Sequence, residues 1–182
     1  MKLIQRFIKQ MKSEPKKKSF KWTVSENKIL SIADVNRFRG ACLEFKEEGI
    51  KHRKFFLIRD WFMIELGLFT GLRVDEMRQL KVGDMLINGK QSSVVVQNGK
   101  GSRKRSVWIN ADFKKICIEF LELRKKLGLN NSPDCFVLSS AEGVLLTKRA
   151  LQKAFKRCMN KAGLSEEYSI HSLRHTYGTF LL

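Results

Sequence analysis

The stretch HSLRH, at residues 171–175, carries two side chains that together suit a phosphate group. His171 and Arg174 are three residues apart, so a helix over this stretch presents both on one face. The guanidinium offers a planar fork of donors to two phosphate oxygens, and the imidazole can donate a hydrogen bond or move a proton. The stretch therefore predicts a phosphate-binding helix whose remaining partners come from elsewhere in the chain.

The charge balance is the strongest signal in the composition of this 182-residue chain. It has 36 Lys and Arg residues against 18 Asp and Glu, which gives a formal charge of +18 at pH 7. Such an excess attracts polyanions, and aromatic residues lie among the basic ones, so a merely solubilising surface is the weaker explanation. RNA is a competing polyanion, but no RNA-recognition motif supports it. The composition predicts a protein that binds nucleic acid.

The other bulk features indicate a folded, cytoplasmic protein without membrane contact. Hydrophobic residues make up 43% and charged residues 30%, as in ordinary globular domains. The four cysteines are too far apart in the sequence for a metal knuckle or a redox pair, which fits a reducing compartment. The longest apolar run, at 61–69, contains Glu65 and is too short to span a bilayer. The N-terminus lacks the apolar core of a secretory signal.

A basic N-terminal segment precedes the part of the chain with regular hydrophobic spacing. Residues 1–12 are expected to form a basic amphipathic helix, followed by a linker. Beyond the linker, apolar spacing predicts helices over about 27–48, 53–69, 74–80, 111–127 and 147–162. For the first of these helices, Ser31 or Asp34 could cap the start and Gly49 could mark the end.

The period changes between residues 84 and 109. Asn88-Gly89 is a strong two-residue hairpin signal, SSVVVQ at 92–97 is β-branched, and RSVWI at 105–109 alternates between apolar and polar residues. We predict a three-stranded antiparallel sheet with Lys100 at the tip of its second hairpin. The fold class is therefore α+β and mainly α, with a small sheet.

A second anion-binding candidate lies in TGLRVDE at residues 70–76. Thr70 and Gly71 end one helix, and the next begins at Val74, so Arg73 stands where backbone donors also favour an anion. Glu76 follows three residues later and is expected to hold the surroundings of Arg73 in place. Taken alone, Arg73 would be read as an ordinary surface arginine.

Two groups of basic residues are predicted to contact DNA. Arg103, Lys104 and Arg105 belong to the second hairpin, and Lys148, Arg149 and Lys153 to the helix over 147–162. A helix charged on its outer faces suits the DNA backbone or the major groove, although a solvated surface is the alternative.

The order of these motifs closely resembles the catalytic domain of tyrosine recombinases, the phage integrase family. The motifs are TGLRVDE with Arg73, NGKGSRKR with Lys100, and HSLRHTYGTFLL with His171 and Arg174. The resemblance covers roughly residues 28–182 and implies an integrase-like catalytic core there. Residues 1–27 would then be a possible remnant of the family's N-terminal DNA-clamping domain.

The resemblance implies site-specific recombination or integration of DNA through a covalent phosphotyrosyl link, with no metal or other cofactor. Arg73 and Arg174 would clamp the phosphate, Lys100 would act as general acid, and His171 would bond the phosphate or assist proton transfer. Glu76 and His175 would support them. The implied partners are double-stranded DNA at a specific recombination site and, in the full-length form, further copies in a tetramer on that DNA.

The tyrosine nucleophile is the main departure from the family pattern. In the family it follows the HSLRH helix, whereas this sequence ends at Leu182. Tyr168 precedes the motif, and Tyr177 occupies a position that usually packs, so the nucleophile stays unassigned and Tyr177 is not the expected one. We expect a core that holds the scissile phosphate but is inactive alone. The alternative is a DNA-binding or regulatory relative that does not cleave.

Zinc binding is a weaker alternative for the same helix. His171 and His175 are four residues apart, a spacing that can hold zinc. The glutamate of the zinc-protease motif is absent and no third ligand is evident, so the sequence predicts no metal site.

Overall fold

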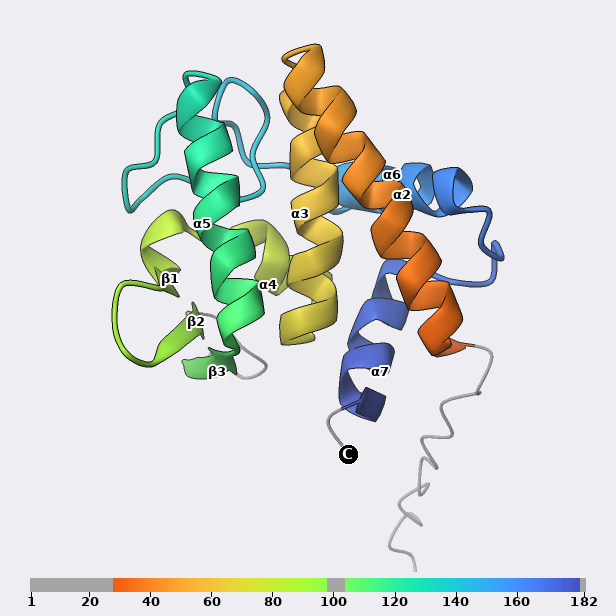
Figure 1. Cartoon of the computed structure of the whole chain (residues 1–182). Helices are drawn as coiled ribbons and strands as arrows, with labels where there is room; N and C mark the ends of the chain where they lie inside the picture. The colour runs from red at the N-terminus through yellow and green to blue at the C-terminus, as the bar shows by residue number, and fades with distance from the viewer. Residues whose placement is uncertain (1–27, 98–103, 181–182) are drawn as a thin grey trace, which may run out of the picture.

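The computed structural model describes residues 28–97 and 104–180, and its central element is helix α3. Figure 1 shows α3 between α2 and α5, with the small sheet below α5 and α7 at the lower ends of α2 and α3. The helices are α2 (Ile32–Lys51), α3 (Phe55–Thr70), α4 (Val74–Gln79), α5 (Ala111–Lys126), α6 (Lys148–Ala162) and α7 (Ile170–Phe180). The predicted α+β, mainly α fold is confirmed. The expected helix and linker at 1–27 lie outside the described residues.

Helix α3 is buried on all sides because its sequence, FFLIRDWFMIELGLFT, is apolar all round. Phe62 is fully buried and stacks on Phe120 of α5, with the ring centroids 3.9 Å apart. The helix ends at Gly71, whose φ of 57° is the left-handed conformation that favours glycine. The predicted core helix is therefore the element against which α2, α5, α6 and α7 pack.

Two carboxylates of α3 are buried, and each is paired with arginine. Asp60 accepts hydrogen bonds from its neighbour Arg59 and from Arg157 of α6. Glu65 accepts two from Arg39 Nε of α2, at 2.9 and 3.0 Å. Burial raises the pKa of Glu65, and Arg39 opposes that effect. Because a buried carboxylate is costly without a partner, these pairs fix how α2 and α6 lie on α3.

The predicted three-stranded antiparallel sheet is confirmed. It consists of β1 (Met85–Leu86), β2 (Ser92–Val96) and β3 (Arg105–Ile109), in the order β1-β2-β3, and a 3-10 turn, η2 (Val82–Asp84), leads into it. Val94 pairs with both Met85 and Val107. Along β3, Arg105, Val107 and Ile109 are half-buried, whereas Ser106 and Trp108 are exposed. Arg105 therefore lies on the inner side of the sheet.

The start and end of α2 show why boundaries are hard to predict. The helix begins later than expected, at Ile32, and the predicted cap at Ser31 is confirmed because its hydroxyl accepts the Asp34 N–H at 3.1 Å. Gly49 lies inside the helix and does not end it. A Cβ there would stand 2.7 Å from Ile58 Cγ1, so this glycine permits the close approach of α2 to α3.

Arg124 of α5 organises the loop at the opposite end of the molecule from α7. It is 1% exposed and donates hydrogen bonds to Asn130 O, Asn131 Oδ1, Phe136 O and Val137 O, at 2.7–3.2 Å. Within the described residues no carboxylate pairs with it, and burial lowers the pKa of Arg124. Its donors instead bind loop oxygens, one of which, Val137 O, is buried and the others partly buried.

The described residues carry no helix that is both long and apolar enough to cross a bilayer. The four cysteines are free thiols, and three of them, Cys42, Cys117 and Cys158, are buried.

Candidate phosphate-binding site

Arg73 stands at the junction between α3 and α4. Gly71 turns the chain in the left-handed conformation, and Arg73, with φ −70° and ψ 155°, is the extended residue that immediately precedes α4. Its backbone N–H donates to Glu76 Oε2 at 2.8 Å, and 42% of its side chain is exposed. Because α4 has only six residues, the anion-binding capacity here comes from the arginine side chain and not from the helix terminus.

Glu76 joins two arginines from different elements. Its side chain is 4% exposed, and Arg105 of β3 donates to both of its oxygens, each at 2.8 Å. Arg73 Nη1 donates to Oε1 at 3.2 Å. Burial raises the pKa of Glu76, but the hydrogen bonds from Arg105 and Arg73 outweigh burial and bring the pKa to about 2. The carboxylate is therefore ionised at neutral pH.

Helix α7 brings Arg174 to the same junction. Arg174 is half-buried and donates from Nη1 to the carbonyl of Gly71. Gly71 lies two residues before Arg73, so this bond brings Arg174 to the turn that carries Arg73. Burial lowers the pKa of Arg174, and the positive charge of Arg73 lowers it further. The structure thus brings together Arg73 and Arg174, the pair predicted to clamp a phosphate.

Gly67 of α3 and Gly71, which caps that helix, allow α7 to approach so closely. A Cβ at Gly67 would stand 2.5 Å from Leu173 Cδ1, and one at Gly71 would stand 2.2 Å from the ring of Tyr177. Side chains at either position would push α7 outward, and Arg174 would move away from Arg73 with it.

The two histidines of α7 occupy different environments. His171 is exposed one turn before Arg174, where it can reach a ligand held by that arginine. His175 is half-buried, and burial, followed by the charges of His171, Lys28 and Arg174, lowers its pKa. Among the described residues, no group of three or more His, Cys, Asp or Glu side chains is arranged to hold a metal.

The two tyrosines are both engaged by neighbouring residues. Tyr168 donates its hydroxyl to Asp34 Oδ2 at 3.1 Å, which directs it toward α2. Tyr177 is half-buried, and its ring packs on Gly71.

The basic residues predicted to contact DNA fall in three places. Arg149 and Lys153 line a shallow hollow of about 430 Å³ on the outer face of α6, while Lys148 pairs with Asp75 of α4 at 2.6 Å. Lys104 is exposed just before β3. Arg103 lies outside the described residues, as does Lys100, the predicted general acid. DNA contact by the basic residues of this group stays a prediction.

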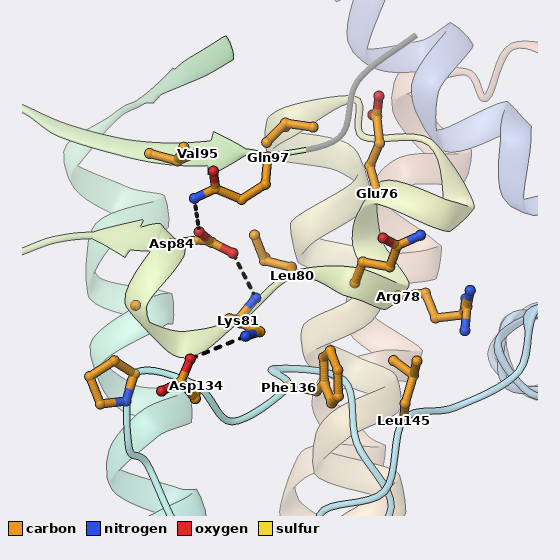
Figure 2. Close-up of a pocket in the computed structure, with 14 residues that line it drawn as sticks. Glu76, Arg78, Leu80, Lys81, Asp84, Val95, Gln97, Asp134, Phe136 and Leu145 are labelled. Carbon is orange, nitrogen blue, oxygen red and sulfur yellow. Dashed lines mark hydrogen bonds and ion pairs between the residues drawn. The ribbon is translucent and has the colours of Figure 1, made fainter. Parts of the chain in front are cut away.

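A larger hollow, of about 800 Å³, lies between α4, β2 and the loop around Pro133. Figure 2 shows that its acidic groups are bonded to neighbours: Asp84 accepts from Gln97, and Asp134 pairs with Lys81. Asp84 also accepts the Lys81 N–H at 3.0 Å. The bond from Gln97 holds the residue after β2 against Asp84 of η2.

The bond between Arg105 and Glu76 was missed by the sequence interpretation, which placed Arg105 among the DNA contacts. A signal for it was present. RSVWI alternates, so Arg105 shares the inward side with Val107 and Ile109, and an inward arginine requires an acidic or carbonyl partner.

Comparison with known proteins followed two routes, by sequence and by structure. Residues 43–182 match the pattern that defines the Phage integrase family. The chain is 29% identical over 126 residues to the tyrosine recombinase XerC of Lactobacillus leichmannii, covering 69% of this chain and 42% of that protein. It is 30% identical over 156 residues to XerD of Listeria innocua serovar 6a, covering 85% of this chain and 49% of that protein.

Among solved structures, the fold is similar to that of the XerH site-specific recombinase bound to a palindromic difH substrate. The TM-score is 0.67 at 26% sequence identity, and the match covers 85% of this chain and 41% of that one. The chain therefore spans less than half the length of the relatives named here.

Proposed function

Because the chain belongs to the phage integrase family, we propose that residues 28–182 form the core of a tyrosine recombinase that binds DNA and holds the scissile phosphate for site-specific recombination. The observation that carries this proposal is the convergence of Arg73 and Arg174. They come from segments a hundred residues apart, and α7 brings them together at the carbonyl of Gly71.

The two arginines would act on the non-bridging oxygens of a phosphodiester. A guanidinium stays charged and presents parallel donors, so two of them can stabilise the negative charge that grows on these oxygens during displacement. Repulsion between Arg73 and Arg174 persists until an anion lies between them, which favours binding of a phosphate. His171, exposed one turn from Arg174, would donate a further hydrogen bond or assist proton transfer. Lys100 would be the general acid for the leaving hydroxyl.

Double-stranded DNA is the proposed partner. The XerH structure contains a DNA substrate, and this chain carries a formal charge of +18. Arg149 and Lys153 on α6, with Lys104 before β3, would contact the DNA backbone around the site. We further propose that several copies assemble on one recombination site, and that residues 1–27 belong to the end of an N-terminal DNA-clamping unit.

No tyrosine of this chain is assigned as the nucleophile. The Tyr168 hydroxyl donates to Asp34, and the Tyr177 ring packs on Gly71. A duplex with a nick beside the cleavage site traps a covalent adduct whenever a tyrosine attacks. We expect no adduct from this chain alone. An adduct that disappears in Tyr177→Phe would identify Tyr177 as the nucleophile.

DNA binding is tested with duplexes selected from a random pool by the full chain. Fluorescence anisotropy across a series of salt concentrations should show affinity that falls steeply with salt, because phosphate contacts release counterions. Arg73→Gln and Arg174→Gln should each reduce the salt slope by about one. Lys125→Gln, at the end of α5 remote from the site, is the charge-matched control. An affinity independent of salt, or equal losses in all three variants, would refute the proposal.

A further inference from the structure

We propose that Arg105 is a positioning residue: by holding Glu76 with its own fork, it limits Arg73 to one side-chain bond with Glu76 and leaves the other guanidinium donors of Arg73 for the scissile phosphate. This role rests on the proposed function, because it requires Arg73 to bind a phosphate. Arg105 would act through Glu76, without contacting the phosphate itself.

The geometry at Glu76 shows an unequal division between the two arginines. Arg105 holds the carboxylate with its planar fork, one nitrogen to each oxygen, both at 2.8 Å. The Arg73 side chain makes one longer bond, from Nη1 at 3.2 Å, while its backbone N–H donates to the other oxygen at 2.8 Å. A bidentate fork is the strongest form of this interaction, so Arg105 is the principal counter-ion of Glu76.

This division matters because Glu76 must have a cation. Its side chain is 4% exposed and ionised, and a buried carboxylate without a partner is strongly unfavourable. If Arg105 were removed, the nearest replacement is Arg73, whose Nη1 is already bonded to Oε1. A bidentate pair between Arg73 and Glu76 would then use the donors that a phosphate requires.

The same ion pair connects two parts of the proposed site. Arg105 is the first residue of β3, opposite Val96 of β2, and these two residues flank the segment that contains Lys100. Glu76 lies on α4, immediately after Arg73. The pair therefore fixes the start of β3 against α4.

A double-mutant cycle separates positioning from direct DNA contact. With Glu76 intact, Arg105→Gln should lower duplex affinity about tenfold and reduce the salt slope by about one, because the Arg73 contact is lost. In a Glu76→Gln background, Arg73 has no carboxylate to hold it, so Arg105→Gln should leave the slope unchanged. An equal loss of slope in both backgrounds would show direct phosphate contact by Arg105 and overturn the proposal. Circular dichroism establishes that each variant is folded.

A second measurement needs neither DNA nor a Glu76 variant. Nitrogen-detected NMR of the arginine side chains should show slowed guanidinium rotation and shifted Nη resonances for Arg73 in Arg105→Gln, as expected for a bidentate pair. Lys125→Gln should leave these resonances in place. Unchanged Arg73 resonances in a folded Arg105→Gln protein would overturn the proposal. Wild-type affinity independent of salt would instead refute the proposed function, while the Arg73 resonances would still test the role of Arg105.

Discussion

Arg124 in α5 and Arg174 in α7 are both tied to backbone carbonyls, yet they differ in how many donors remain free. Arg124 is 1% exposed and gives its donors to a set of loop oxygens. Arg174 is half-buried and makes one hydrogen bond among the described residues, to Gly71. A guanidinium that is fully used holds the fold together. One that is half-buried and bonded through a single nitrogen keeps donors for a ligand.

The largest expected effect comes from removing the fully used arginine. Arg124→Ala should destabilise the protein by about 3–5 kcal/mol, since it leaves several buried oxygens without donors and opens a cavity. Urea unfolding measures the loss. At temperatures where the variant is folded, its DNA affinity should match the wild type. A loss below about 1 kcal/mol would mean that water satisfies these oxygens and that the contrast with Arg174 fails.

The second effect tests Gly71, whose carbonyl accepts the hydrogen bond from Arg174. Gly71→Ala places a Cβ 2.2 Å from the Tyr177 ring and forces a non-glycine residue to φ 57°. We expect destabilisation of about 2–3 kcal/mol, measured by thermal unfolding. Gly128→Ala is the matched control, because Gly128 also has positive φ, 85°, but no atom within 4 Å of a Cβ. Equal losses of stability in the two variants would mean that backbone strain alone explains the effect of Gly71→Ala, and that the Tyr177 contact contributes nothing.

The third effect concerns Arg174 itself. Arg174→Gln should weaken duplex binding about tenfold while changing the free energy of unfolding by about 1 kcal/mol or less, because only one hydrogen bond is lost. Anisotropy and urea unfolding of the same preparation measure both quantities. A stability loss as large as that of Arg124→Ala would show that Arg174 mainly stabilises the fold, as Arg124 does, and would contradict the contrast between them.

The smallest effect is the pH dependence of Glu76. Its pKa in the folded protein, about 2, lies below the ordinary value of 4.5. Its ion pairs therefore contribute stability that is complete above pH 4.5 and is lost as pH falls toward 2. The two arginines are 35–42% exposed, so solvent screens the pairs and we expect about 1 kcal/mol. Unfolding of wild type and Glu76→Gln at pH 7 and pH 3 gives the difference, and identical pH profiles would contradict the assignment.

The sequence was most informative where function depends on short-range spacing. His171 and Arg174 share a helix face, and Arg73 and Glu76 share a helix start, so their local geometry follows from their numbering. The sheet was predictable because β-branched alternation and turn residues are also local signals. These patterns lie within one helix or strand, where the backbone geometry of that element determines which side chains share a face.

Contacts between distant elements were not predictable in the same way. Arg124 looked like one of several basic residues in the last turn of α5, and its burial depends on carbonyls that arrive 6–13 residues later in a loop. Gly49 looked like a helix terminator, whereas its actual neighbour is Ile58 of α3. Such roles depend on which elements pack against each other in the folded protein, and the pattern of a single sequence does not reveal that packing.

The hydrogen bond from the Leu30 N–H to the Thr176 hydroxyl has a consequence for how the domain is made. The bond is buried, 3.0 Å long, and joins residues 146 positions apart. As the chain leaves the ribosome, Leu30 emerges long before its acceptor exists. The surface of α3 around Gly67 likewise stays uncovered until Leu173 of α7 has been synthesised. Docking of α7 should therefore follow the emergence of α2 and α3 by more than a hundred residues, and the same step brings Arg174 to the end of α3.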